Sequence, residues 1–330
     1  MDIFAPDYYH NFTCIADKCP DSCCKDWCVD VDAETTALYL QLPGALGEHL
    51  RQILVVSNDS CTMELENGRC PMWRQDGLCQ IQAELGHDGL CKTCREFPRL
   101  RHDYGDFIEL GLELSCPEAA KLILSSPCSK WMKTTPVDAE DFDEQTMNTL
   151  LRSRGDFLNF LETATLPFPK ILTVLLLYAY EVQEELDGGA AAVLEPEGCL
   201  ADADKFPAQG DFAKLQEFFL GLEILTPQWR ERLNVPPVRP CWENQYRSLL
   251  YYFICRYWLQ AVSDLDIVCR AKFMIAACLL MGCLGGDLVE TAQLFSKEIE
   301  NDPDNLEAIF DGAYAAAALT DLHLLGLLKN

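Results

Sequence analysis

The chain has 330 residues, of which 49% are hydrophobic and 24% are charged, so it can bury the core of one large domain or two ordinary ones. A chain of this size does not need the disulfide staples of small secreted scaffolds. Its formal net charge of −26 argues against nucleic acid and anionic membrane surfaces as partners, and is compatible with a basic protein surface.

The N-terminal part, residues 1–135, contains few periodic segments. It begins without a signal-peptide pattern, which predicts a cytoplasmic protein with reduced thiols. A helix is predicted from Asp32, as the N-cap, to Leu42, and an alternating pattern predicts a strand or extended segment over 108–114. A further helix is predicted over 117–125, with proline in its first turn. The rest of this part is expected to consist of loops.

Residues 136–330 are predicted to be helical, following a linker near 125–144. Apolar residues recur at helical spacing in six segments: 143–164, 168–188, 242–262, 266–284, 288–301 and 304–328. The longest apolar runs, 171–180 and 273–284, are too short to span a bilayer. The predicted fold is mainly α, with an irregular, cysteine-rich, metal-organised domain (1–135) packed against a C-terminal helical array (136–330).

Cysteine is concentrated near the N-terminus. Twelve of the 18 cysteines lie in residues 1–135, and residues 14–28 read CIADKCPDSCCKDWC. Such clusters form disulfides, bind a metal or cluster, or carry out thiol redox chemistry. In a reducing compartment, and in a chain with its own core, metal binding is favoured over disulfides. A redox pair at Cys91 and Cys94 is less favoured, because no thioredoxin-like strand pattern surrounds it.

The type of metal follows less directly from these residues. Thiolates select zinc, cuprous copper or iron–sulfur clusters. Only Cys91 and Cys94 have the Cys-x2-Cys spacing of a zinc knuckle, whereas Cys-Pro pairs at 19–20, 70–71 and 116–117 are typical of cluster ligands. The sequence therefore favours an iron–sulfur cluster, with zinc as the alternative. Adjacent Cys23 and Cys24 are not expected to bind the same ion.

Motifs of several enzyme classes are absent from the sequence. It contains no Cys-x3-Cys-x2-Cys, no glycine-rich dinucleotide or phosphate loop, and no H-E-x-x-H. Radical S-adenosylmethionine chemistry, nucleotide binding of the common types and zinc hydrolysis are therefore not expected.

Six short blocks occur in order over roughly residues 8–125. They are Phe12-x-Cys14, Cys19-x-Asp21-Ser22-Cys23-Cys24, Cys70-Pro71, Gly77-Leu78-Cys79, Thr93-Cys94-Arg95-x-Phe97-Pro98-Arg99 and Ser115-Cys116-Pro117. Together they resemble the flagellin lysine-N-methylase family, which is related to a wider set of cysteine-rich zinc- or iron-chelating proteins. The helical remainder carries no motif that matches.

The resemblance implies a bacterial, cytoplasmic, S-adenosylmethionine-dependent lysine N-methyltransferase that acts on flagellin and requires a four-iron–four-sulfur (4Fe–4S) cluster. It implies eight metal ligands: Cys14, Cys19, Cys23, Cys24, Cys70, Cys79, Cys94 and Cys116. Four further cysteines look additional to the family pattern: Cys28, Cys61, Cys91 and Cys128. The alternative is a non-catalytic zinc- or iron-chelating protein, which differs in that no lysine gains mass.

Three residues beside the cysteines are candidates for cofactor binding. Trp27 offers a cation–π surface, against the alternative that it is a core side chain. Arg95 and Arg99 can neutralise an anionic cluster or bind a carboxylate, against the alternative that they form structural salt bridges. Catalytic residues stay unassigned. Four carboxylates are candidates to align a lysine amine, against the alternative that each is a solvated surface charge: Asp21, Asp26, Asp30 and Glu96.

Overall fold

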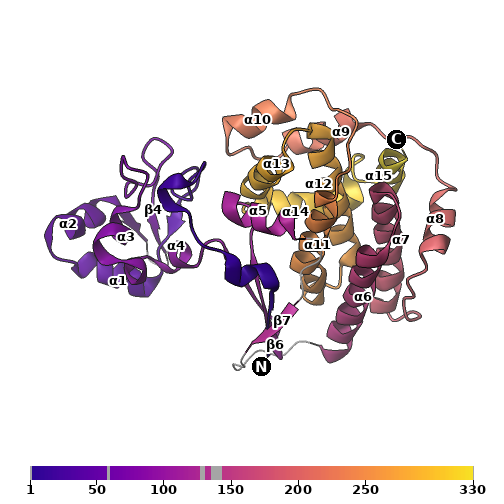
Figure 1. Ribbon diagram of the computed structural model, residues 1–330, viewed down its shortest axis with the longest axis horizontal. Helices are drawn as coiled ribbons and strands as arrows, with labels where there is room; N and C mark the ends of the chain where they lie inside the picture. The colour runs from indigo at the N-terminus through magenta and orange to yellow at the C-terminus, as the bar shows by residue number, and fades with distance from the viewer. Residues whose placement is uncertain (1, 58–59, 127–130, 135–142, 330) are drawn as a thin grey trace.

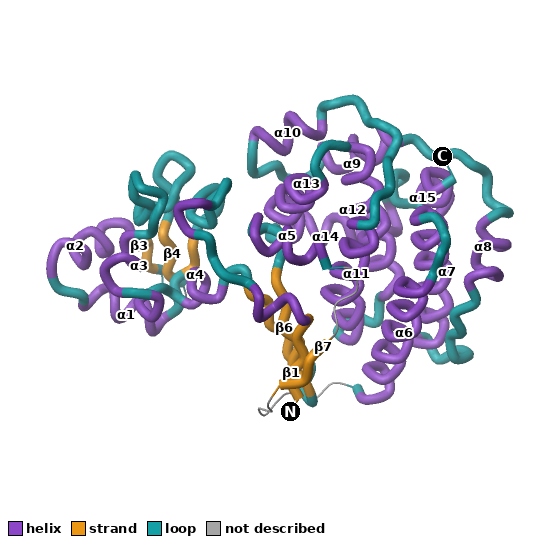
Figure 2. The backbone as a smooth tube through the Cα atoms, in the orientation of Figure 1, coloured by secondary structure: helices purple, strands orange, loops and turns teal. Residues whose placement is uncertain are grey.

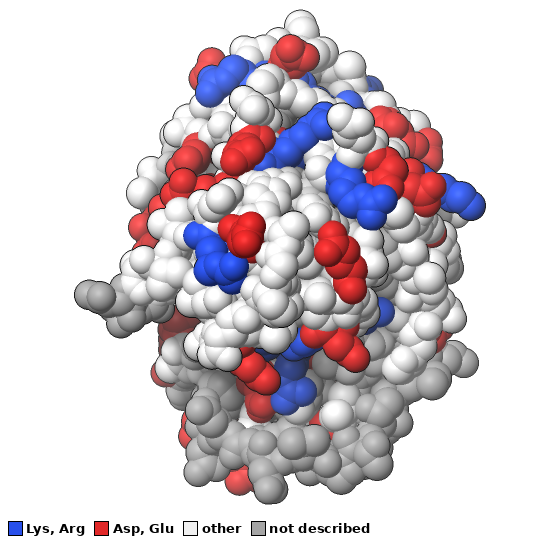
Figure 3. All heavy atoms as spheres, turned by 90° about the vertical axis from the view of Figure 1, so that its left-hand side faces the viewer, with Lys and Arg blue, Asp and Glu red and all other residues white. Residues whose placement is uncertain are grey.

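The computed structural model describes residues 2–57, 60–126, 131–134 and 143–329. Two lobes lie at opposite ends of the molecule, and a small sheet lies between them (Figures 1 and 2). Helices dominate the described residues, so the prediction of a mainly α protein is confirmed. Seen from the side of the cysteine-rich lobe, the surface carries both signs of charge around a broad uncharged area, so the negative net charge is not gathered on that face (Figure 3).

The smaller lobe, which we call the cysteine lobe, spans residues 16–96. Its elements are β2 (Val29–Asp30), α1 (Ala33–Gln41), α2 (Gly44–Ile53), β3 (Leu54–Val56), β4 (Cys61–Met63), α3 (Gln80–Leu85) and α4 (Lys92–Glu96). The strands form an antiparallel sheet in the order β2-β4-β3. The predicted helix α1 is confirmed, and the Asp32 carboxylate accepts from the Thr35 N–H at 2.9 Å.

The expectation of loops elsewhere in this lobe is wrong for α2, α3 and α4. Each is a short helix of ten residues or fewer, too short for the apolar period to stand out in the sequence. The lobe has its own buried core, in which Tyr39, Leu50 and Met63 are fully buried. The Tyr39 hydroxyl donates to the Gly89 carbonyl at 2.7 Å, which ties α1 to the loop before α4.

The sheet between the lobes has the order β5-β6-β1-β7. Its strands are β1 (Asp2–Pro6), β5 (Arg99–Asp103), β6 (Phe107–Leu112) and β7 (Trp131–Thr134). β1 runs parallel to β6, with Ile3 opposite Ile108, and the other two pairings are antiparallel. The extended segment predicted over 108–114 is confirmed as β6. β1 pairs with β6 and β7 over a hundred residues or more, which local patterns do not reveal, whereas β5 pairs with β6 as a hairpin, Asp103 opposite Ile108.

The larger lobe, which we call the helical lobe, contains α5 (Pro117–Ser125) and the ten helices from residue 144 onward. These are α6 (Glu144–Thr163), α7 (Phe168–Leu186), α8 (Pro196–Ala203), α9 (Phe212–Leu220), α10 (Pro227–Leu233), α11 (Gln245–Tyr257), α12 (Ile267–Leu284), α13 (Leu288–Phe295), α14 (Pro303–Ala315) and α15 (Asp321–Leu328). Helix α12 lies at the centre, in contact with α7, α11 and α14. In the described part of the chain it is the one helix long and apolar enough to cross a membrane, and it is fully buried as a core helix.

Two predicted segments of the helical lobe need correction. The helix predicted over 304–328 is two helices, because Ala316 ends α14 in an extended conformation and Thr320 caps α15. The segment 288–301 begins as α13 and continues as a π-helical turn, Ser296–Glu300. Helices α8 to α10, in a stretch with no predicted element, each begin beside a proline or an aspartate cap.

The core of the helical lobe reaches into the N-terminal part of the sequence. Tyr8, Phe12 and Leu112 are buried with the helices of residues 144–328. The strand segments 2–6 and 99–112 therefore pack with the helical lobe, whereas residues 29–91 form the separate core. The proposed division near residue 135 remains a prediction, because residues 127–130 and 135–142 lie outside the described part.

Candidate functional site

Five of the eight predicted ligand cysteines share one local geometry. Each sulfur accepts a hydrogen bond from the backbone N–H two residues further along the chain, in the pairs Cys14/Ala16, Cys19/Asp21, Cys70/Met72, Cys79/Ile81 and Cys116/Glu118. Cys79 and Cys116 also stand at the N-cap positions of α3 and α5, where the helix dipole favours a negative charge. These N–H groups are the kind of partner that tunes metal-bound sulfur.

Burial works against the ionisation of these thiols. It raises the pKa of Cys70 and Cys116 to about 11, and it also raises the pKa of Cys19 and Cys79. The backbone N–H groups lower each of these pKa values, but by less than burial raises them. The thiols are therefore protonated at neutral pH in the metal-free protein. Binding of a metal or cluster by these cysteines would release protons.

Six thiols gather in the cysteine lobe, and we call them the first thiol group: Cys23, Cys24, Cys70, Cys79, Cys91 and Cys94. Two hydrogen-bonded pairs anchor it. The Cys24 thiol donates to Cys23 and lowers the pKa of Cys23 to about 7. The Cys94 thiol donates to Cys91 and lowers the pKa of Cys91 to about 7 in the same way. The group thus contains one cysteine, Cys91, that the family resemblance left out.

The remaining predicted ligands, Cys14, Cys19 and Cys116, form a second thiol group. Cys116 interacts electrostatically with both others, and Cys19 also interacts with Cys23 of the first group. Cys116 precedes α5, which packs on α11 and α13 of the helical lobe. The second group therefore lies where the chain passes between the cysteine lobe and the helical lobe.

The donor set fits a thiophilic metal in its chemistry, but its spacing does not fit a single bound ion. Among the described residues, no three His, Cys, Asp or Glu side chains are arranged to hold one metal ion. Tetrahedral zinc needs four donors at about 2.3 Å from the metal. A cluster of several atoms accepts thiolates that are spread farther apart. Whether these thiols hold an iron–sulfur cluster or zinc stays a prediction.

The other cysteines occupy different surroundings. Cys61 is buried in β4, Cys28 is exposed, and Cys128 lies outside the described residues. Of the later cysteines, Cys199, Cys269, Cys278 and Cys283 are buried in or beside apolar helices, where they pack as small hydrophobic side chains.

The three predicted cofactor residues lie in separate places. The Trp27 indole N–H donates to the Cys23 carbonyl at 2.7 Å, which keeps the ring beside the first thiol group. Arg95 reaches back to the Leu90 carbonyl at 3.5 Å, and the Arg99 guanidinium lies 5.2 Å from the centre of the Phe12 ring. Their roles in binding a cofactor stay predictions.

A pocket of about 190 Å³ lies between the two lobes, and we call it the interlobe pocket. The cysteine lobe contributes Ser22, Cys23, Asp26 and Trp27, the connecting segments contribute Phe97 and Ser115, and the helical lobe contributes Leu225, Lys297, Asn301, Asp302 and Pro303. It thus brings two of the predicted residues, Asp26 and Trp27, beside a predicted ligand, Cys23.

Ion pairs close one wall of the interlobe pocket. The Lys297 ammonium, on the π-helical turn, lies 3.1 Å from carboxylate oxygens of both Asp21 and Asp26. Lys25 binds the second oxygen of Asp21 at 2.6 Å. Burial raises the pKa of Asp21, but the ammonium groups of Lys25 and Lys297 outweigh it and keep that pKa below its usual value. Sequence reasoning missed Lys297, because it stands 271 residues from Asp26 and in no motif.

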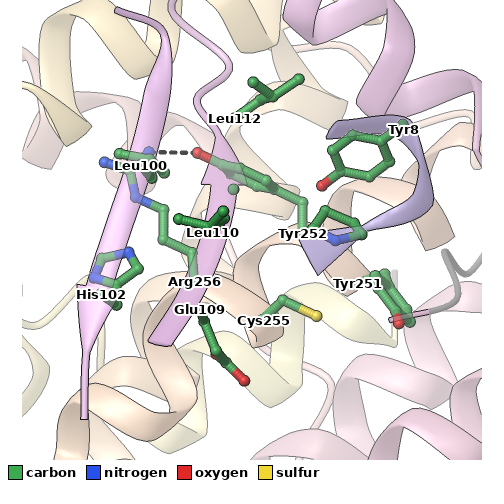
Figure 4. Close-up of a pocket in the computed structure, with 12 residues that line it drawn as sticks. Tyr8, Leu100, His102, Glu109, Leu110, Leu112, Tyr251, Tyr252, Cys255 and Arg256 are labelled. Atoms are coloured by element: carbon green, nitrogen blue, oxygen red, sulfur yellow. Dashed lines mark hydrogen bonds between the residues drawn. The ribbon is translucent and has the colours of Figure 1, made fainter. Parts of the chain in front are cut away.

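A second, smaller cavity of about 30 Å³, enough for roughly one water molecule, lies under the central sheet (Figure 4). Strands β5 and β6 and helix α11 line it, with His102, Tyr8 and Arg256 among its side chains. Burial, helped by the positive charge of Arg256, lowers the pKa of His102 to about 4. The imidazole is therefore neutral at physiological pH.

This histidine predicts an acid-dependent loss of stability. An unfolded histidine titrates near pH ~6.5, so the folded state loses free energy of unfolding as the pH falls from ~6.5 through about 4, by up to about 3 kcal/mol. Urea unfolding at a series of pH values tests this. We expect His102→Phe to flatten the slope between these limits. An unchanged slope in that variant would assign the acid sensitivity to other groups.

The comparisons with known proteins point to one family. The flagellar biosynthetic protein FliU of Salmonella muenchen is 35% identical over 134 residues, which make up 38% of this chain and 79% of FliU. Proteins named lysine-N-methylase from Salmonella choleraesuis and Salmonella typhimurium are each 30% identical over 188 residues, or 54% of this chain and 46% of theirs. The chain thus matches about half the length of the lysine-N-methylases. No protein-family model and no solved structure matches it.

Proposed function

Because the chain belongs to the family of FliU and the lysine-N-methylases, we propose that it is a protein lysine N-methyltransferase. In this proposal it moves a methyl group from S-adenosylmethionine to lysine ε-amines of flagellin, and it depends on a cysteine-ligated iron–sulfur cluster. The similarity to two proteins named lysine-N-methylase is the observation that carries the proposal. The flagellar name of FliU supports flagellin as the substrate.

The eight predicted cysteines, joined by Cys91, are the residues that would hold the cluster. An iron–sulfur cluster supplies one-electron chemistry at a potential set by hydrogen bonds to its sulfurs and by burial. The chain's own contribution is to present thiols from several loops, five of them with the backbone N–H partner described above, and to bury several of them partly. Zinc bound by the same thiols is the alternative, and metal analysis distinguishes zinc from an iron–sulfur cluster.

The substrate lysine must lose a proton before it can react. Its ammonium has an unperturbed pKa near ~10.4, and only the neutral amine attacks a methyl sulfonium. Desolvation in a pocket lowers that pKa, and a carboxylate aligns the amine. Asp26 lines the interlobe pocket and is the best placed of the four candidate carboxylates, whereas Asp30 is exposed.

The test begins with protein purified without oxygen and analysed for iron, zinc and acid-labile sulfide. Purified flagellin is then incubated with the protein and S-adenosylmethionine, and its lysines are examined by mass spectrometry. We expect iron with sulfide, and methylated lysines that disappear when S-adenosylmethionine is omitted. Flagellin with acetylated lysines is the matched control substrate. Cluster-loaded protein that never methylates flagellin would contradict the proposal.

A non-catalytic metal-binding protein is the second candidate. One observation favours it, since the match covers only 46% of the lysine-N-methylases. It predicts bound metal without binding of S-adenosylmethionine and without any gain of lysine mass.

A further inference from the structure

We propose that the interlobe pocket binds the side chain of a lysine, and that Lys297 holds the place of the incoming ammonium in the free protein. The inference rests on the proposed function for the identity of the substrate. Its structural basis is the aromatic, acidic and backbone features of the pocket, which Cys23 of the first thiol group also lines.

Two aromatic rings form a corner of the pocket. Trp27 and Phe97 meet edge to face, with ring centres 5.3 Å apart and planes at 67°. The hydrogen bond from the indole N–H to the Cys23 carbonyl fixes the orientation of Trp27. Such a corner packs the apolar stem of a lysine and attracts its ammonium through the ring faces. An anionic side chain would gain nothing from these rings.

The acidic wall of the pocket already binds a lysine ammonium. Lys297 lies between Asp21 and Asp26, and its side chain is 12% exposed, whereas that of Asp26 is 27% exposed. Lys25 lies 2.6 Å from Asp21 but 3.9 Å from Asp26, so departure of Lys297 would leave Asp26, which faces the pocket, as the less compensated carboxylate. An incoming ammonium would restore the balance of charge.

The backbone on both sides of this ion pair is unusual. Asp26 has a φ of 71°, in the left-handed region that non-glycine residues seldom adopt. Lys297 belongs to the π-helical turn, and Asn301, Asp302 and Pro303 of the pocket follow directly after that turn. Strained residues and π-helical turns both concentrate at functional sites. Both features occur at this pocket, the positive φ at Asp26 and the π-helical turn at Lys297.

The volume of the pocket also limits the size of the ligand that it can hold. Sites for drug-sized molecules occupy roughly 300–1,000 Å³, which is more than the 190 Å³ available here. One extended side chain suits this volume better than a whole nucleoside cofactor. The pocket therefore fits the lysine of a protein substrate rather than the complete methyl donor.

The experiment measures binding of Nα-acetyl-lysine N-methylamide to the full chain by NMR titration, with the norleucine analogue as a neutral probe of similar stem. We expect Lys297→Met to strengthen binding of the lysine probe about tenfold, since the resident competitor is gone. Phe97→Leu, which leaves the ion pairs intact, should weaken it about fivefold. Asp88→Asn, at a fully exposed aspartate in the same lobe, is the matched control and should change nothing.

The outcomes separate this proposal from the proposed function, because methyl transfer to flagellin is measured on the same preparations. Equal binding of the lysine probe to all variants, or equal binding of both probes, overturns the pocket even when methyl transfer occurs. The expected shifts in a protein that transfers no methyl group support the pocket and count against the methyltransferase alone.

Discussion

Replacing Cys79 with serine is expected to lower the iron and sulfide bound per chain by tenfold or more, and to lower methyl transfer to flagellin with it. Cys79 belongs to the first thiol group, and its sulfur accepts two backbone N–H bonds at the start of α3. A serine hydroxyl stays protonated at neutral pH and is a poor ligand for iron in a cluster. Metal analysis, sulfide analysis and the visible spectrum of protein purified without oxygen measure the change.

The matched control is Cys241→Ser, because Cys241 is exposed in the helical lobe and far from the motifs. It should retain metal and activity. Cys91→Ser is the more demanding test, since the family pattern omits Cys91 whereas the structure pairs it with Cys94. Loss of metal in that variant would support a role for the whole first thiol group. Full metal content in Cys79→Ser would exclude Cys79 as a ligand.

The sequence predicts the local features of this fold well. Helix α5 has the predicted limits, and Asp32 caps α1 as expected, because a proline or a capping aspartate marks where a helix begins. The long helices α7 and α12 are confirmed because their apolar residues persist over 18 residues or more. Short elements escape prediction, since three or four residues of a strand carry too little pattern to distinguish them from a loop.

The candidate site could be predicted only in part from the sequence. The resemblance to the flagellin lysine-N-methylase family implied eight candidate ligands, but not the division into two thiol groups, which depends on how loops far apart in sequence pack together. The interlobe pocket joins Trp27 to Phe97 and Asp26 to Lys297. No local signal marks Lys297, because a single lysine in an amphipathic helix reads as a solvated side chain. Contacts between distant segments have to be read from the structure.

The largest effect on stability is expected from the buried ion pair between Arg154 on α6 and Glu109 on β6. The guanidinium makes two hydrogen bonds to the carboxylate, at 2.8 and 2.6 Å, and the two side chains are 10% and 5% exposed. The pair fastens the central sheet to the helical lobe. Removal of one partner leaves a charge buried without its counterion, so Arg154→Met should lower the free energy of unfolding by about 3–5 kcal/mol.

The double variant Arg154→Met with Glu109→Leu should recover most of that loss, because both charges leave the interior and apolar packing replaces them. Urea unfolding of the single and double variants measures the coupling. Arg152→Met, two residues away on the same helix, is the matched control: Arg152 pairs with Glu185 and Asp156 at 39% exposure, so it should cost no more than about 1 kcal/mol. A double variant as unstable as Arg154→Met would show that packing of the arginine stem, rather than the isolated charge of Glu109, holds the sheet against α6.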